Sequence, residues 1–347
     1  MTKKFILFLL LLANIYVRAE DKRLDKAEWY FLFDPEGLSP QMDVYDQNNA
    51  IIMGKLSYLA YYSKKDIEFA ETKFQSAFPK SNVSIKFYDK KNSSGTQYII
   101  FTTNTYSILS FRGTEFSPFK NDLYVDMKFR AYKNPDDKNE QDNSWYNMPS
   151  GHAGFRKALK KTMDKGLFND LESAMIEGGH ENWKAVPLYT CGHSLGAGLA
   201  TLIIEPLKTA DSNYSGTYTF SPPMSISQVD QSEYDQFNQV NGAIIHNIIN
   251  YRDYVPRAGK TASGQLEHVG HYYRICLSKI LVKTKPLAIK FYGIRKLFVK
   301  KYHSFENIIE YIQNSNNSSK DILERASAKC LCREDQNQRY SNDLMLD

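Results

Sequence analysis

The feature that most constrains the fold is a single serine set between two glycines, in Gly192-His193-Ser194-Leu195-Gly196. Residues 186–191 before it form a short apolar run typical of a β-strand, and residues 195–210 are rich in Leu, Ile and Ala and predict a buried helix. A strand should therefore turn sharply into a helix with Ser194 at the apex, because side chains at either glycine position would collide there. Such a turn lifts the serine hydroxyl clear of the sheet and directs the first N–H groups of the helix at an anion forming beside it. We interpret this stretch as a nucleophile elbow, the alternative being a tight turn with an inert serine.

The first residues have the pattern of an export signal. Lys3 and Lys4 precede an apolar run over residues 5–13, and Val17 and Ala19 are small residues at the positions that precede a cleavage site. We expect a signal peptide over residues 1–19 and a secreted protein, because the run is too short to span a bilayer, which needs roughly 20 apolar residues. Cleavage would remove three bases and no acid and so lower the net charge from +5 to +2, which gives no indication of nucleic-acid binding.

The rest of the chain predicts one domain and a short tail. No linker rich in Pro, Gly or Ser divides residues 20–332, which suit one α/β domain, and the polar residues 333–347 are expected to be disordered. Cys191 should be a buried free thiol because it ends the strand before the elbow, whereas Cys276 could pair with Cys330 or Cys332.

The pattern of apolar residues predicts alternating helices and strands before and after the elbow. Helices are expected over 44–62 and 66–78, followed by strands over 83–88, 96–102 and 106–111. Further along, we expect an interrupted helix from 151 to 176, strands over 217–220 and 244–251, a strand from 271 through 276, and a helix that begins at 303 and runs through 312.

Several polar residues stand at strand ends or helix starts, where functional side chains of an open α/β sheet gather. Phe111-Arg112-Gly113-Thr114 ends one strand and could turn a backbone N–H into the pocket of the elbow serine, and Asp253 follows the strand over 244–251. His152 could be catalytic, although a histidine at a helix start is more often a structural hydrogen-bonding residue. Residues 115–129 carry exposed-looking aromatic side chains and suggest a mobile flap.

Taken together, these motifs and His303 resemble the class 3 lipase family over roughly residues 48–312. The resemblance implies an α/β-hydrolase fold: a mostly parallel central sheet with helices on both faces and a short lid, here residues 115–129. It also implies hydrolysis of acylglycerols or related lipid esters. Residues 221–223 read Ser-Pro-Pro where the family commonly has Gly-Ser-Pro, and the serine strand ends in Cys191, departures that touch no triad position.

Carried over by position, the resemblance implies a Ser-His-Asp triad with the chain order of α/β-hydrolases. Ser194 matches the nucleophile, Asp253 the acid and His303 the base. The backbone N–H groups of Thr114 and Leu195 match the oxyanion hole.

The choice of base rests on the expected fold. His193 adjoins the nucleophile and should point away from it, while His268 and His271 come soon after Asp253 at the start of a strand. His303 begins the helix that returns the chain to the serine, so it is preferred, with His268 as the alternative.

We therefore expect a secreted serine ester hydrolase of the triacylglycerol lipase kind, working through an acyl-enzyme. A phospholipase, a general esterase, and a non-catalytic lipid-binding protein on the same fold are the alternatives. No cluster of His, Cys or acidic residues has the spacing of metal ligands, and no metal or cofactor is expected.

A basic segment over residues 274–301 carries nine Lys and Arg residues and no acid. If residues 286–301 are helical, Leu287, Phe291, Ile294 and Phe298 form one apolar stripe with the bases mostly around it. Such a surface suits docking on anionic lipid, and the alternative is a solvated basic face over the core.

Overall fold

The computed structural model of the protein describes residues 32–90, 96–113, 146–228, 230–250, 253, 255–257, 266–275, 308–309 and 312–313. Its strands are β1 (Ser84–Asp89), β2 (Gln97–Thr102), β3 (Ser107–Phe111), β4 (Leu188–His193), β5 (Tyr214–Phe220), β6 (Ile226–Ser227), β7 (Ile245–Asn250), β8 (Leu266–Glu267) and β9 (His271–Ile275). Its α-helices are α2 (Gln47–Leu59), α3 (Lys64–Ala77), α5 (Ala153–Asp164), α6 (Leu167–Glu177), α7 (Leu195–Leu202), α8 (Ile204–Thr209) and α9 (Gln231–Asn241). Short 3-10 turns are η1 (Pro35–Gly37), η2 (Trp183–Ala185), η3 (Gly242–Ile244) and η4 (Val255–Arg257). No helix in these ranges is both long and apolar enough to span a membrane.

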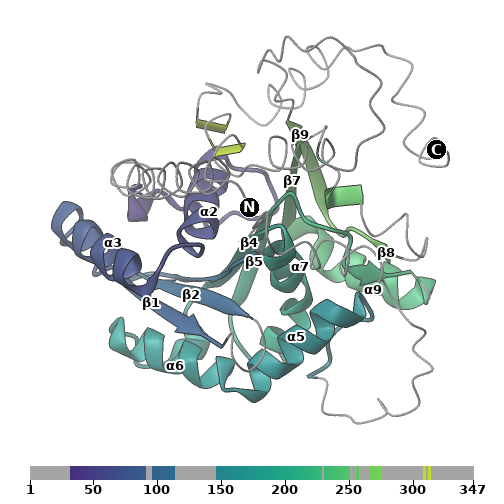
Figure 1. Ribbon diagram of the computed structural model, residues 1–347, viewed down its shortest axis with the longest axis horizontal. Coiled ribbons are helices and arrows are strands. Elements are labelled where there is room, and N and C mark those ends of the chain that lie inside the picture. The colour runs from purple at the N-terminus through teal and green to yellow at the C-terminus, as the bar shows by residue number, and fades with distance from the viewer. Residues whose placement is uncertain are drawn as a thin grey trace, which may run out of the picture.

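Seven strands form one central sheet in the order β1-β2-β3-β4-β5-β7-β9 (Figure 1). The pairs β1/β2 and β2/β3 are antiparallel, and the four pairs from β3 to β9 are parallel. The carboxyl ends of these parallel strands lie along one edge of the sheet, and α-helices connect β3 to β4, β4 to β5 and β5 to β7. The mostly parallel sheet expected from the sequence is confirmed, and β6 and β8 form a separate antiparallel pair.

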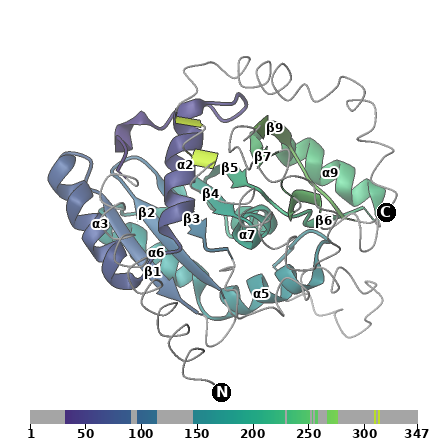
Figure 2. The same cartoon turned by 45° about the horizontal axis from the view of Figure 1, so that its top comes forward.

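Helices cover both faces of this sheet, as expected (Figures 1 and 2). Alternate residues of β2 contribute to two buried clusters: Ile99 and Phe101 pack with α2 and α3, while Tyr98 and Ile100 pack with α5, α6 and α7. Because side chains of a strand alternate between its faces, one strand can supply both layers of the core.

Polar side chains fix the starts of α2 and α3. The Asp46 carboxylate accepts a hydrogen bond from the Asn49 backbone N–H at 2.8 Å, and Ser63 and Asp66 form a reciprocal capping box. Each cap satisfies N–H groups that have no partner within the helix and contributes about 1 kcal/mol.

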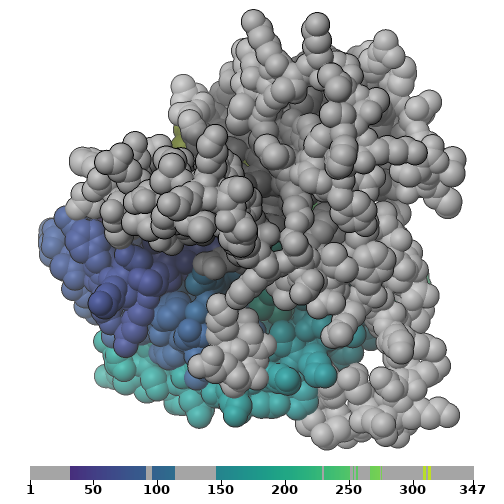
Figure 3. Space-filling view, in the orientation of Figure 1, coloured from purple at the N-terminus to yellow at the C-terminus, as the bar shows by residue number. Residues whose placement is uncertain are grey.

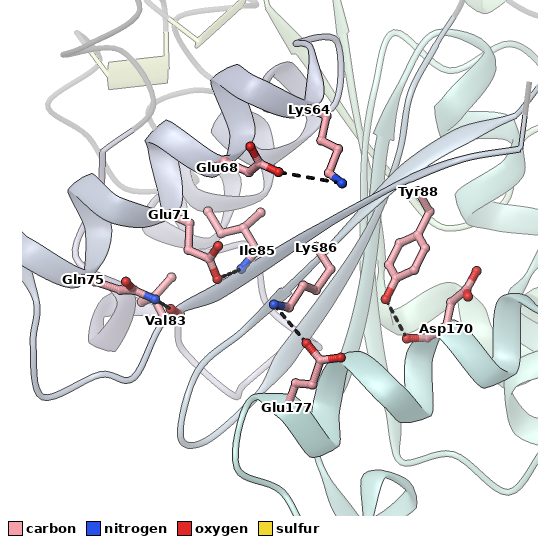
Figure 4. A network of polar contacts seen from close by, with 10 residues as sticks. All are labelled: Lys64, Glu68, Glu71, Gln75, Val83, Ile85, Lys86, Tyr88, Asp170 and Glu177. Carbon is pink, nitrogen blue, oxygen red and sulfur yellow. Dashed lines mark hydrogen bonds and ion pairs between the residues drawn. The ribbon is translucent and has the colours of Figure 1, made fainter.

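Side chains of α3 form hydrogen bonds with the backbone of the edge strand β1 and of the residue before it (Figure 4). The Ile85 backbone N–H donates to the Glu71 carboxylate at 3.1 Å, and the Gln75 side-chain amide donates to the Val83 carbonyl at 3.0 Å. Side chains of a helix thus occupy backbone groups that an exposed edge would present to another strand.

Helix α6 holds the same strand from the opposite face (Figure 4). Lys86 pairs with Glu177 at 3.0 Å, and the Tyr88 hydroxyl donates to the Asp170 carbonyl at 3.2 Å. The space-filling view shows the surfaces of α3 and α6 on opposite sides of this edge (Figure 3).

The prediction of one continuous helix over residues 195–210 is wrong. Helix α7 ends at Leu202, and a second helix, α8, begins at Ile204. Pro206 explains the break, because it has no N–H to donate to the carbonyl of Leu202 and its ring crowds that carbonyl. The interruption expected within 151–176 falls at Lys165 and Gly166, where Gly166 has φ +95°.

Helix α9 was not expected from the pattern of apolar residues. Only two of its residues, Phe237 and Asn241, are buried, so its apolar stripe is too narrow to detect. The available signal was its start, where the Asp230 carboxylate accepts from the Glu233 N–H at 3.1 Å, in the Asp-x-x-Glu spacing of a helix N-terminus.

The described part of the last expected helix packs on α2. Residues 308–309 and 312–313 are helical, and Ile308, Ile309 and Ile312 have no exposed surface. A Cβ atom added to Gly54 of α2 would lie 2.0 Å from Ile309 Cδ1 and 3.3 Å from the Phe220 ring. Glycine therefore lets this late segment approach α2 directly above the end of β5.

We expect Ile309→Ala to lower the free energy of unfolding by about 2–5 kcal/mol, because it leaves a cavity in a fully buried site. Chemical denaturation measures the change. The matched control is Ile176→Ala on α6, where the side chain is 53% exposed and the effect should stay within about 0.5 kcal/mol. Equal effects at both positions would contradict the packing of this segment on α2.

Candidate active site

The predicted elbow is a sharp turn between β4 and α7. Strand β4 ends at His193, α7 begins at Leu195, and Ser194 between them has φ 57° and ψ −127°. The Ser194 N–H donates to the Phe220 carbonyl of β5 at 3.0 Å, which fixes the turn to the neighbouring strand. Because non-glycine residues rarely adopt positive φ, the turn is strained at its central residue.

Both glycines of the motif stand where backbone meets backbone. A Cβ atom on Gly192 would lie 2.4 Å from the Gly196 carbonyl carbon, and one on Gly196 would lie 2.2 Å from the Phe111 carbonyl oxygen. The expected collision is confirmed, with the addition that Gly196 brings α7 against the end of β3. The first turn of α7 is thereby set between the ends of two parallel strands.

The Ser194 hydroxyl is completely buried, and within the described part of the chain Oγ has no hydrogen-bond partner. Leu195 is the first residue of α7, so its N–H has no acceptor within the helix. An unpartnered hydroxyl and a helix N-terminus therefore meet at the carboxyl end of β4, an arrangement that can stabilise an anion forming at the serine.

A second serine in the neighbouring strand shares the unusual properties of Ser194. Ser221 follows β5, has φ 46° and is completely buried, and its Oγ likewise has no hydrogen-bond partner among the described residues. Its N–H donates to the Ile248 carbonyl of β7 at 2.8 Å, so it stands between the strand of Ser194 and the strand that precedes Asp253. This is the position of the Ser-Pro-Pro departure noted in the sequence.

We expect Ser221→Gly to stabilise the fold by about 1 kcal/mol. Glycine removes a positive-φ strain of about 1–3 kcal/mol and an unpaired hydroxyl, against an entropic cost of roughly 0.5–1 kcal/mol. Ser221→Ala removes only the hydroxyl and keeps the strain, so its melting temperature should lie between those of the wild type and the glycine variant. A lower melting temperature for Ser221→Gly would contradict this assignment of strain.

Asp253 lies at the same edge of the sheet as Ser194. It is 1% exposed, its N–H donates to the Asn250 carbonyl at 2.9 Å, and its Oδ1 accepts from the Val255 N–H at 3.0 Å. Strand β5 alone separates β4 from β7, and all three are parallel, so the turns that carry Ser194 and Asp253 leave the same edge of the sheet one strand apart.

Several predicted features lie outside the described residues. They are Thr114, His303, the flap over 115–129, the signal peptide over 1–19, the tail over 333–347, the cysteines other than Cys191, and the basic segment apart from Arg274 and Ile275. Among residues that the structure does describe, no group of three His, Cys, Asp or Glu side chains could hold a metal ion. Cys191 is buried and free, as expected, and burial raises the pKa of its thiol to about 11.

His268, the alternative base, is bonded to the loop that follows Asp253. Its Nε2 lies 2.8 Å from the Pro256 carbonyl, which can only accept, so Nε2 carries the proton and holds the loop in place. Burial lowers the pKa of His268 to about 4, and the bond to Pro256 offsets only part of that effect. The ring is therefore neutral near pH 7.

His152 has the structural role weighed for it in the sequence. It is the N-cap of α5, where Nδ1 accepts from the Phe155 N–H at 3.3 Å, and its ring stacks on the Phe155 ring with centroids 4.1 Å apart.

His193 has a partner that the sequence did not suggest. Its Nδ1 is hydrogen-bonded to the Tyr61 hydroxyl at 2.9 Å. Tyr61 lies just beyond α2 among several other tyrosines, and no local pattern distinguishes it from them.

Stability should fall as the pH is lowered from about 6.5 to about 4. The folded-state pKa of His268 is about 4, below the ordinary value of 6.5, so the unfolded chain binds more protons within this window. His246, also lowered to about 4 by burial, acts in the same direction. His268→Gln keeps an amide N–H for Pro256 and cannot titrate, so its unfolding free energy should fall less steeply with acid.

Denaturant unfolding at several pH values measures these slopes. His246→Gln tests the second contribution: it keeps a side-chain N–H for the Met42 carbonyl, which lies 2.7 Å from Nε2 of His246, and it should flatten the profile in the same way. Identical pH profiles for wild type and His268→Gln would refute the contribution of His268.

Comparisons with known proteins agree with the motifs. The family model described as lipase (class 3) matches residues 108–262, a range that holds the elbow and Asp253. The Lip2 lipase of Yarrowia lipolytica is similar in structure, with 17% identity, a TM-score of 0.48, and coverage of 67% of this chain and 82% of that one. A lipase from Rhizopus microsporus var. chinensis shows 16% identity, a TM-score of 0.47, and coverage of 70% of this chain and 85% of that one.

No curated protein sequence matches. The resemblance to class 3 lipases and the α/β-hydrolase class of the fold are confirmed.

Proposed function

We propose, from the class 3 lipase match over residues 108–262, that the protein is a secreted serine hydrolase of lipid esters. The observation that carries the proposal is the turn at Ser194: a strained residue between the end of β4 and the start of α7, whose buried hydroxyl has no hydrogen-bond partner among the residues that the structure describes. Strain and an unsatisfied polar group both cost stability, and such costs concentrate where a residue reacts.

In the proposed mechanism Ser194 is the nucleophile, His303 the base and Asp253 the acid. His303 takes the proton of the Ser194 hydroxyl as Oγ attacks the ester carbonyl, and Asp253 stabilises the resulting imidazolium. The N–H groups of Thr114 and Leu195 stabilise the oxyanion, the alcohol leaves with the proton from His303, and water then cleaves the acyl-enzyme by the same route. No step requires a metal or cofactor.

The packing around Gly54 supports His303 as the base. Ile309 and the Phe220 ring both approach the Gly54 position, and the Phe220 carbonyl accepts from the Ser194 N–H. His303 precedes Ile309 by six residues in the sequence, so the chain between them can span at most about 20 Å. His268 is the weaker candidate because its Nε2 proton is bonded to the Pro256 carbonyl.

The family match favours a lipid ester as substrate, with a phospholipid or a small soluble ester as alternatives. A lid over residues 115–129, docking on anionic lipid through residues 274–301, and the division into a signal peptide, one domain over 20–332 and a tail are parts of the same proposal. Their support comes from the sequence patterns alone.

Hydrolysis of a short p-nitrophenyl ester tests the proposal. Ser194→Ala and His303→Ala should each lower kcat by about 10⁶-fold, because the triad acts as a unit, whereas His268→Gln should keep most of the activity. Circular dichroism on each variant controls for folding.

Two outcomes would contradict it. Equal hydrolysis by wild type and Ser194→Ala would exclude the serine mechanism, and lipid binding without any Ser194-dependent hydrolysis would favour a lipid-binding protein on the same fold. A greater loss in His268→Gln than in His303→Ala would reverse the assignment of the base.

A further inference from the structure

We infer that Tyr61 is a positioning residue whose hydroxyl holds together the ends of β3 and β4, and with them the two backbone N–H groups of the proposed oxyanion hole. The inference rests on the proposed function and adds a residue to it. Tyr61 lies beyond the carboxyl end of α2, far in the sequence from both strands. Its hydroxyl is 2.9 Å from Nδ1 of His193, the residue before the candidate nucleophile.

The same hydroxyl also contacts the end of β3. A Cβ atom on Gly113 would lie 2.0 Å from the Tyr61 hydroxyl oxygen and 2.5 Å from the His193 carbonyl oxygen. Three groups from three separate segments thus converge where only a glycine fits. Gly113 comes directly before Thr114, and His193 lies two residues before Leu195, so Tyr61 contacts residues within two positions of both proposed oxyanion donors.

A clamp is needed here because the sheet itself no longer joins these segments. The ladder between β3 and β4 ends at the pair Phe111 and Gly192, and the Arg112 N–H donates instead to the Gln97 carbonyl of β2 at 2.9 Å. Beyond that pair the β3–β4 ladder does not continue, and packing at Gly196 and the Tyr61 contacts join the two strand ends in the described residues. An oxyanion hole acts only if its donors keep their spacing, because a shift of about 0.5 Å weakens the hydrogen bonds to the transition state.

The groups around Tyr61 restrain its ring and keep its hydroxyl protonated. The Arg112 guanidinium lies over the Tyr61 ring, 5.6 Å from its centroid, which restrains the ring. Burial raises the pKa of the Tyr61 phenol, and Arg112 and the Gly113 backbone N–H oppose that rise without cancelling it. Tyr61 therefore stays protonated at neutral pH and can donate to His193 while it accepts from Gly113.

The test is Tyr61→Phe, which removes one oxygen. We expect kcat for a p-nitrophenyl ester to fall by about 10- to 100-fold with KM unchanged, because displaced donors weaken only the transition state and complete loss of one donor costs about 10²- to 10³-fold. The matched control is Tyr106→Phe. Tyr106 directly precedes β3, and the substitution removes a buried hydroxyl that donates to the Pro35 carbonyl at 2.7 Å. Its kcat should stay at the wild-type value.

Two variants of His193, Asn and Leu, have side chains of similar shape and separate positioning from folding. His193→Asn can place a polar atom near the position of Nδ1 and should keep much of the wild-type kcat. His193→Leu cannot, and its kcat should fall as far as that of Tyr61→Phe. Combining Tyr61→Phe with His193→Leu should cost little more than either alone, because both break the same contact. Active sites are counted by titration with a serine-directed phosphonate, so that kcat refers to folded enzyme.

Each other outcome overturns the inference. An unchanged kcat in Tyr61→Phe, or a loss explained entirely by fewer titratable sites, leaves the proposed function standing and removes the role of Tyr61. A rise in KM at constant kcat would make Tyr61 a substrate contact instead. Absence of Ser194-dependent hydrolysis in the wild type would overturn the inference together with the proposed function.

Discussion

The close approach of the first turn of α7 to the ends of β3 and β4 is the constraint on which the rest of the site depends. Gly192 and Gly196 permit it, since a side-chain carbon at either position would lie within 2.4 Å of backbone atoms. At this approach Ser194 has a positive φ, and its buried hydroxyl has no hydrogen-bond partner in the part of the chain that the structure describes. The two glycines thus convert an ordinary crossover of an α/β sheet into a reactive geometry, at a cost in stability that the two layers of the core offset.

Local patterns in the sequence were sufficient for the sheet and the elbow, because strand and helix periodicities and a paired glycine signal act within a few residues. Their failures have physical causes. The helix after Ser194 breaks because Pro206 lacks an N–H, a signal that was present, and α9 was missed because its buried stripe is narrow. The contact of Tyr61 with His193 joins distant segments, and no periodicity encodes such a pair. The positive φ of Ser221 depends on how β5 leaves the sheet, which only the assembled fold determines.

The histidines illustrate how burial divides one residue type among different tasks. His152 caps a helix, His268 holds the loop after Asp253, and His246 donates to the Met42 carbonyl within an aromatic cluster. Burial lowers the pKa of the last two to about 4, which keeps them neutral and suits them to fixed hydrogen bonds. A base that must gain and lose a proton near neutral pH needs an ordinary or raised pKa, and this requirement favours a histidine outside such environments.

The packing of Ile309 against Gly54 also bears on the order in which the molecule is assembled during synthesis. The two residues lie near opposite ends of the chain, so α2, the sheet and Ser194 all leave the ribosome before the segment that covers α2. Until that segment docks, the α2 surface at Gly54 lacks the isoleucines that bury it. A nascent chain therefore buries this face of α2 only after residue 312 has left the ribosome, and truncation before residue 308 would leave that apolar face uncovered for chaperones to bind.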